Sequence, residues 1–233
     1  MAKSRVVLPE LLDELPPQDK SALRSRRDLR RLNAWMRHAP IMAQALKKNW
    51  PGSERAPVVE LGAGDGHFLL SVAGRLNGFS HGANCVLVDR LETVDPQVFG
   101  RFQNLGWNAQ FQKTDVVDWL RQGSAESHSV ILSNLFFHQF KDDKLAEMLG
   151  LAANKTRMVI ALEPRRSWQS RICGRLLWAI GCNSVTRHDA QVSIDAGFAD
   201  KELSRLWPDK ENWHLTEKPV GLFSHLFIAR RKE

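Results

Sequence analysis

Val58-Val59-Glu60-Leu61-Gly62-Ala63-Gly64-Asp65-Gly66 is the stretch that decides the fold of this 233-residue chain. Two β-branched residues and a leucine lead into three glycines spaced two apart, and residues 67–73 then open a helical pattern. The segment therefore predicts a strand, a tight loop and a helix. A loop of this kind brings backbone amides close to a ligand.

A dinucleotide is the first candidate ligand, and the residues argue against it. Its usual motif places a pyrophosphate on the helix N-terminus and has a glycine or alanine where this chain has His67. Here Glu60 precedes the loop and Asp65 lies within it, so two carboxylates would repel a pyrophosphate. S-adenosylmethionine fits better, because its ammonium and sulfonium groups are positive and it carries no phosphate.

The segment 60–66 after a hydrophobic strand resembles the first motif of class I S-adenosylmethionine-dependent methyltransferases. The resemblance implies a Rossmann-like, doubly wound α/β fold whose seven-stranded sheet has one antiparallel closing strand, with an N-terminal helical lid. It also implies S-adenosylmethionine as the cofactor. The loop residues then assigned to cofactor binding are Glu60, Gly62, Ala63, Gly64, Asp65 and Gly66.

Asp89 ends the second predicted strand, 84–89, and follows Gly66 by 23 residues. One helix and one strand need about that distance for two strand ends to lie at the same edge of a sheet. A carboxylate there can accept both ribose hydroxyls of the cofactor, as the resemblance implies, and Arg90 beside it is assigned to the same site. The alternative is that Asp89 only ends a strand.

Asp115 follows the third predicted strand, 108–112. The family usually has an acid at this point that contacts the exocyclic amine of adenine, so the resemblance assigns Asp115 and Val116 to the cofactor site. Asp115 could also be the N-cap of a helix over 116–120, and the two roles are compatible.

The fourth predicted strand ends at Asn134, which is assigned to the cofactor site. Ligands of α/β sheets bind outside the carboxyl ends of the strands, so the loop 135–140 should flank the transferred methyl group. His138 is the first candidate for a general base that forms a phenolate. The alternative is structural packing among the phenylalanines of this loop. His188, in a polar segment 181–190 expected to face the acceptor, is the second candidate.

The other expected elements follow from apolar periodicity and breaker residues. Ser21 is expected to cap the helix over 21–38 and Pro40 to break it, His67 to start a helix, and His225 to pack in the closing strand. The predicted helices span about 21–38, 41–48, 67–73, 96–105, 116–120, 141–153, 167–180 and 200–206, and the remaining strands about 58–61, 129–134, 158–162, 214–219 and 222–229.

Length and composition suit one globular domain, which we divide into a helical lid over 1–50 and a methyltransferase domain over 51–233. No run reaches the roughly 18 apolar residues of a membrane helix, so we expect a cytoplasmic protein.

The three cysteines show no C-x-x-C spacing, which argues against disulfides and zinc. The catechol-type branch of the family has acidic magnesium ligands where this chain has Asn134, so we predict no metal.

Residues 1–50 carry 11 Lys and Arg against 5 Asp and Glu. This basic segment could bind nucleic acid or could be a solvated helix face. Amino-directed nucleic-acid methyltransferases carry two prolines after the Asn or Asp, which 134–137 lacks. The leading hypothesis is therefore methylation of oxygen or activated ring carbon on a small aromatic or polyketide-like acceptor, since 134–140, 181–190 and 221–227 look like bacterial small-molecule methyltransferases. An RNA methyltransferase and a non-catalytic scaffold are the alternatives, and the sequence does not predict the oligomeric state.

Overall fold

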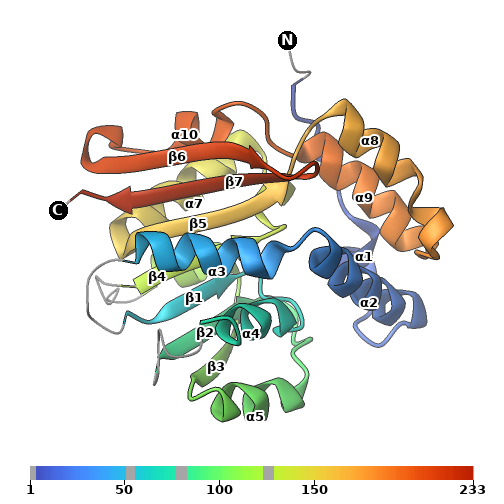
Figure 1. Cartoon of the computed structure of the whole chain (residues 1–233), viewed down its shortest axis with the longest axis horizontal. Helices are drawn as coiled ribbons and strands as arrows, with labels where there is room; N and C mark the ends of the chain where they lie inside the picture. Colours follow the sequence, from blue (N-terminus) through green and yellow to red (C-terminus); the bar gives the residue numbers. More distant parts are fainter. Residues whose placement is uncertain (1–3, 51–55, 77–82, 123–128, 233) are drawn as a thin grey trace.

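The computed structural model describes residues 4–50, 56–76, 83–122 and 129–232. Its seven strands form one sheet in the order β3-β2-β1-β4-β5-β7-β6 (Figure 1). The strands β1 to β5 are parallel, and β7 is antiparallel to both of its neighbours, as the sequence predicted. Their bounds are β1 Val58–Leu61, β2 Asn84–Asp89, β3 Asn108–Lys113, β4 Ser129–Asn134, β5 Thr156–Pro164, β6 Trp213–Val220 and β7 Ser224–Arg231.

Successive residues of the central strands point into two different cores. In β4, Val130 and Leu132 belong to one core and Ile131 to the other. Strands covered on both faces read as continuous apolar runs, which is why the pattern predicted buried strands here. One face is covered by α3 (His38–Asn49), α4 (His67–Ala73) and α5 (Pro96–Asn104), and the other by α6 (Val116–Arg121), α7 (Asp142–Lys155) and α10 (Glu202–Leu206).

A second group of helices gathers beyond the carboxyl ends of the parallel strands (Figure 1). The group consists of α1 (Leu11–Glu14), α2 (Lys20–Trp35), α8 (Trp168–Arg175), the 3-10 turn η2 (Leu177–Ile180) and α9 (Ser184–Ala196). We call these five elements the cap. Helix α9 contacts α1, α2 and α8, and it also contacts η1 (Phe137–Gln139), which follows β4. A third 3-10 turn, η3, spans Lys210–Asn212 before β6.

The start of α2 and the break after it differ from the prediction. Asp19, not Ser21, caps α2, because its carboxylate accepts the amide hydrogens of residues 21 and 22. The expected break at Pro40 was wrong, since the chain turns at Arg37, whose φ is 59°. Pro40 is the third residue of α3, where a helix leaves the amide without an internal partner, so the proline costs no hydrogen bond.

The sequence did not predict a helix in the polar segment 181–190, but the structure has α9 from Ser184 onward. Asn183 caps α9 by accepting the amide hydrogen of Thr186 at 2.8 Å. The buried side of α9 includes Thr186 and Asp189 together with apolar residues. These two polar side chains interrupt the apolar period from which a helix is recognised in a sequence.

The first 50 residues are divided between the cap and the body of the fold. Met42, Ala43 and Leu46 of α3 lie in the same hydrophobic core as β1 and β4, so α3 packs on the sheet, while α1 and α2 lie in the cap. The domain boundary at residue 50 stays a prediction. Within the described ranges, no helix is both long and apolar enough to span a bilayer.

Candidate functional site

The glycine loop after β1 uses its glycines for different reasons. Gly62, Gly64 and Gly66 have φ values of 69°, 54° and 74°, which lie in the left-handed region that favours glycine. A Cβ on Gly62 would overlap the ring of Phe136, whereas one on Gly64 would meet no heavy atom of the described residues within 4 Å. The loop is therefore packed at its start and open at its centre.

Asp89 ties the end of β2 to this loop. Its Oδ2 accepts the amide hydrogen of Gly64 at 2.8 Å, and its Oδ1 accepts that of Leu91 at 2.9 Å. Each carboxylate oxygen has a second lone pair for a further donor. Arg90, which was assigned to the same site, instead pairs with Asp13 of α1 at 3.1 Å and is more than half exposed.

The two acids of the loop motif differ in their surroundings. Asp65 is paired with Arg30 of α2 at 2.5 Å, so the loop contacts the cap. Glu60 is buried beneath the loop, and burial, with the charge of Asp65 adding to it, raises its pKa well above the usual value. Its Oε2 has no hydrogen-bond partner among the described residues. Glu60 therefore favours the neutral carboxyl form, so it does not supply the second negative charge that the sequence predicted at the loop.

Asp115 caps α6, which confirms its predicted structural role. Its Oδ1 accepts the amide hydrogen of Val117 at 2.8 Å, and Val116 is buried at the start of the helix. Asp115 follows β3 and Asp89 ends β2, which are neighbouring parallel strands. The two carboxylates thus lie along one edge of the sheet.

Asn134, at the end of β4, is held by a buried histidine that the sequence analysis missed. Its Oδ1 is 2.7 Å from Nδ1 of His38, whose Nε2 is 2.6 Å from the hydroxyl of Ser224. An amide oxygen only accepts, so Nδ1 donates to it and Nε2 accepts from the serine. Burial lowers the pKa of His38 to about 4, so the ring is neutral. No local pattern marks His38, because its partners lie 96 and 186 residues away in the sequence.

His138 is buried between two carboxylates. Its Nδ1 is 2.8 Å from Glu163 and its Nε2 is 3.1 Å from Glu10. Burial favours the neutral ring, but the hydrogen bonds and charges of these two acids outweigh it and raise the pKa of His138 to about 9. The imidazole is therefore protonated at neutral pH in this conformation, and both ring nitrogens donate.

Glu163, the buried acid near the end of β5, organises the loop after β4. Its Oε1 accepts the amide hydrogens of Phe136 and Phe137 at 3.2 and 2.9 Å. Its Oε2 accepts the amide hydrogen of His138 at 3.2 Å in addition to the imidazole. One carboxylate thus fixes three successive amides of the loop expected to flank the methyl group.

Glu10 belongs to the N-terminal arm, residues 4–10, and closes the other side of His138. Gln139 donates to it at 3.2 Å, and the hydroxyl of Ser193 in α9 also donates. Burial raises the pKa of Glu10, but these hydrogen bonds and that of His138 outweigh it and lower the pKa. Arg5 anchors the arm, because its guanidinium donates to the backbone carbonyls of residues 138, 140 and 196.

His188 lies on α9 and is half-exposed. Its Nδ1 is 2.9 Å from Asp189, whose carboxylate accepts the amide hydrogens of Leu11 and Leu12 at the start of α1. The pair of residues was expected to face an acceptor, and the structure turns Asp189 toward α1. His67 starts α4 and His225 packs in β7 against Glu217, both as predicted.

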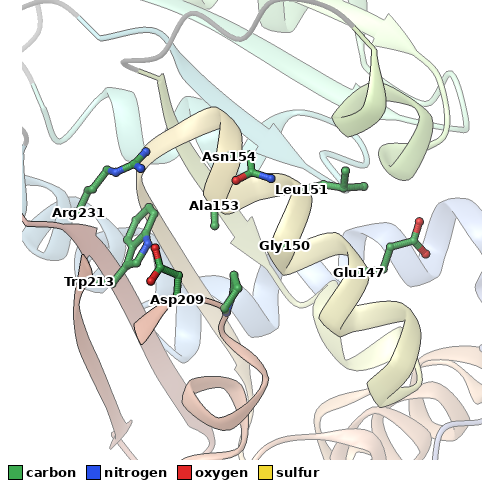
Figure 2. Close-up of a pocket in the computed structure, with 9 residues that line it drawn as sticks. Glu147, Gly150, Leu151, Ala153, Asn154, Asp209, Trp213 and Arg231 are labelled. Atoms are coloured by element: carbon green, nitrogen blue, oxygen red, sulfur yellow. The ribbon is translucent and has the colours of Figure 1, made fainter. Parts of the chain in front are cut away.

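A hollow of about 300 Å³ lies elsewhere, between α7 and the ends of β6 and β7 (Figure 2). It is lined by Trp213, which begins β6, and by Arg231, which ends β7. That is the amino-terminal edge of the parallel strands, opposite the glycine loop. Because open α/β sheets bind ligands at the carboxyl edge, we place the candidate site at the loop. Among the described residues, no cluster of His, Cys, Asp and Glu could hold a metal ion.

Comparison with known proteins finds similarity at the level of structure. No protein-family model matches the chain, and no curated protein matches its sequence significantly. The plantazolicin methyltransferase BamL, solved with a triazolic desmethylPZN analog and S-adenosylhomocysteine (SAH), superposes with a TM-score of 0.62 at 13% identity, over 95% of this chain and 93% of BamL.

Two further solved structures show the same likeness over part of their length. An O-methyltransferase family protein from Burkholderia thailandensis has a TM-score of 0.55 at 18% identity, over 85% of this chain and 57% of that protein. The small RNA methyltransferase HEN1 has a TM-score of 0.59 at 15% identity, over 84% of this chain and 25% of HEN1. The chain therefore spans little more than half of the Burkholderia protein. These likenesses establish its fold as the Rossmann-like fold of class I methyltransferases.

Proposed function

We propose that the chain binds S-adenosylmethionine and transfers its methyl group to oxygen or activated ring carbon of a small aromatic or polyketide-like acceptor. The observation that carries the proposal is the glycine loop at the end of β1, joined to Asp89 by the Gly64 amide at 2.8 Å. The loop lies where the strand order reverses between β1 and β4, which is where open α/β sheets bind ligands. The SAH in the BamL structure supports this choice of cofactor.

The residues present fit this cofactor. The space beside Gly64 is open among the described residues, and both oxygens of Asp89 keep a lone pair for ribose hydroxyls. Asp65 would accept the ammonium group, and Asp115 with Val116 would border the adenine. When bound, S-adenosylmethionine supplies a methyl group on a positively charged sulfur.

The contribution of the protein is mainly alignment. Holding two reactants in attack geometry can supply roughly 7–11 kcal/mol of the barrier. Glu163 fixes the loop after β4 through three amides, and His38 orients the side chain of Asn134 beside it. We assign these two residues as positioning residues for the acceptor and cofactor.

His138 can act as the general base only after Glu10 withdraws. In the described conformation Glu10 occupies Nε2 and helps to keep the ring protonated. A base needs a free nitrogen within hydrogen-bond reach of the acceptor proton. The role we propose for His138 therefore includes a movement of the N-terminal arm, and His188 stays the second candidate.

Replacing Asp89 by alanine should weaken SAH binding by about 2–3 kcal/mol, because it removes the charged group that would accept hydrogen bonds from the ribose hydroxyls. Isothermal titration calorimetry measures this directly. Asp118→Ala is the matched control, since Asp118 is exposed on α6 and pairs with Arg121. Equal affinity of the Asp89 variant and the wild type would contradict the ribose role.

The acceptor can be sought without knowing its identity. The purified protein is incubated with isotope-labelled methyl donor and cell extract, and the products are analysed by mass spectrometry. We expect the label in a small organic compound. Failure to bind SAH would instead favour a non-catalytic scaffold.

RNA methylation is the second candidate, favoured by the fold likeness to HEN1 and the basic helix α2. Arg30 of α2, however, is paired with Asp65 of the glycine loop, which offsets its charge. Labelled RNA in the same extract, with binding that weakens steeply as salt increases, would support this alternative.

A further inference from the structure

Helix α8 and the turn η2 expose large apolar side chains. Trp168 and Ile172 of α8 and Leu176, which directly follows the helix, are spaced four residues apart, so they lie on one side. They are 67%, 48% and 52% exposed. Trp178 and Ile180 of η2 are 62% and 52% exposed. We call these five residues the apolar patch.

The orientation of α8 is set by its packing against α9. Ser170 and Gly174 are the buried residues of α8, and a Cβ on Gly174 would overlap Gln191 and Ile194 of α9. The close approach of the two helices thus requires small residues on the side of α8 that faces α9. Helix α8 reverses the usual pattern, with its small side chains buried and its large apolar ones in solvent. Exposed apolar patches of this kind mark interaction surfaces.

The same region is strongly basic. Residues 164–188 contain five arginines and no aspartate or glutamate. Arg175 and Arg187 are exposed, Arg171 pairs with Asp195 of α9 at 2.7 Å, and Arg166 is buried against Glu202. Helix α2 adds two more guanidinium groups at this place, because Arg24 and Arg31 donate to the carbonyls of Gly181 and Ile180.

We propose that the apolar patch and the arginines around it dock the chain on the surface of a bilayer that contains anionic lipids. Exposed Trp, Ile and Leu side chains insert into the boundary between headgroups and acyl chains, and tryptophan prefers that depth. The arginines attract the negative surface of the membrane. Neither set of residues explains binding alone, and a lipid surface uses both.

Other occupants of this surface use only part of it. RNA would use the arginines and leave five apolar side chains in water. A second copy in a twofold contact would bring two acid-poor basic surfaces together, which like charge opposes. The inference goes beyond methyl transfer and does not depend on it, although it places the cap, and so the acceptor side of the fold, next to lipid.

Co-sedimentation with vesicles tests the proposal on the full chain. We expect binding to vesicles of equal parts phosphatidylcholine and phosphatidylglycerol and much weaker binding to phosphatidylcholine alone. The double variant Trp168→Ser with Trp178→Ser should bind about tenfold more weakly or worse, because it removes apolar area that the bilayer would cover. Both side chains are exposed, so circular dichroism and SAH affinity should stay unchanged.

A charge variant tests the contribution of the arginines to membrane binding. Arg175→Glu with Arg187→Glu should weaken binding by about tenfold to a hundredfold, since each arginine near the surface contributes to attraction. Lys47→Glu with Lys48→Glu is the matched control. It changes the net charge equally but lies in the last turn of α3, away from the cap (Figure 1), and should have little effect.

Equal sedimentation with and without phosphatidylglycerol would overturn the proposal. So would wild-type binding by both the tryptophan variant and the arginine variant. The proposal would also fail if the arginine variant lost binding to polyuridylate but not to the vesicles, or if sedimentation velocity showed a dimer that the tryptophan variant abolishes. SAH titration of the same variants keeps this result separate from the cofactor proposal.

Discussion

Replacing Glu163 by alanine is expected to lower the free energy of unfolding by about 3–5 kcal/mol, the cost of breaking a buried ion pair by removing one partner. The substitution leaves the buried imidazolium of His138 facing only Glu10. It also leaves the amides of residues 136, 137 and 138 without their acceptor. Each unpaired buried donor adds its own desolvation penalty.

Urea denaturation followed by circular dichroism measures this loss. Glu163→Gln separates charge from shape, because its amide oxygen can still accept from the loop while its NH₂ group meets the donors of His138. We expect an intermediate loss for this variant. Glu147→Ala is the control, since the ion pairs of Glu147 with Lys144 and Arg121 lie in solvent and should contribute little. If Glu163→Ala unfolded at the same urea concentration as the control, the role of Glu163 in holding His138 and the loop after β4 would be refuted.

The second large effect is a loss of stability at alkaline pH that comes from His138. Its pKa is about 9 in the folded chain and about 6.5 when unfolded, so the folded state binds the proton more tightly. The resulting stabilisation is complete below about pH 6.5 and is lost as the pH rises through 9. We expect the free energy of unfolding to fall by about 3 kcal/mol across this window.

His138→Gln isolates this contribution, because glutamine keeps a polar side chain but does not titrate. Urea denaturation at pH values from 5 to about 9.5 should give a much flatter stability curve for the variant than for the wild type above pH 6.5. Parallel curves would contradict the raised pKa.

His38 acts in the opposite direction, since its pKa of about 4 lies below the unfolded value. Its contribution is present above about pH 6.5 and is lost as the pH falls toward 4.

Local sequence patterns were sufficient for the elements that build the sheet. The segment 58–66 predicted a strand, a glycine loop and a helix, and the structure has β1, three glycines with positive φ, and α4 in that order. Residues 84–89 and 129–134 form strands with the predicted bounds, and Asp115 caps α6. These features depend on apolar alternation, glycine and capping residues within a few positions, which a sequence displays directly.

The candidate site depends on contacts that sequence spacing does not encode. Glu10 and Glu163 meet His138 across 128 and 25 residues, and His38 meets Asn134 across 96. The protonation of His138 and the neutrality of His38 follow from burial and these partners, so the sequence alone suggested a base without showing that its nitrogens are occupied.

The helix α9 was missed for a related reason, because Thr186 and Asp189 become acceptable on its buried side only when Ser25 and the start of α1 supply their hydrogen bonds. The sequence determined where the sheet and its glycine loop form, because those depend on neighbouring residues; the tertiary structure decided the charge state of the site, because that depends on groups brought together from distant parts of the chain.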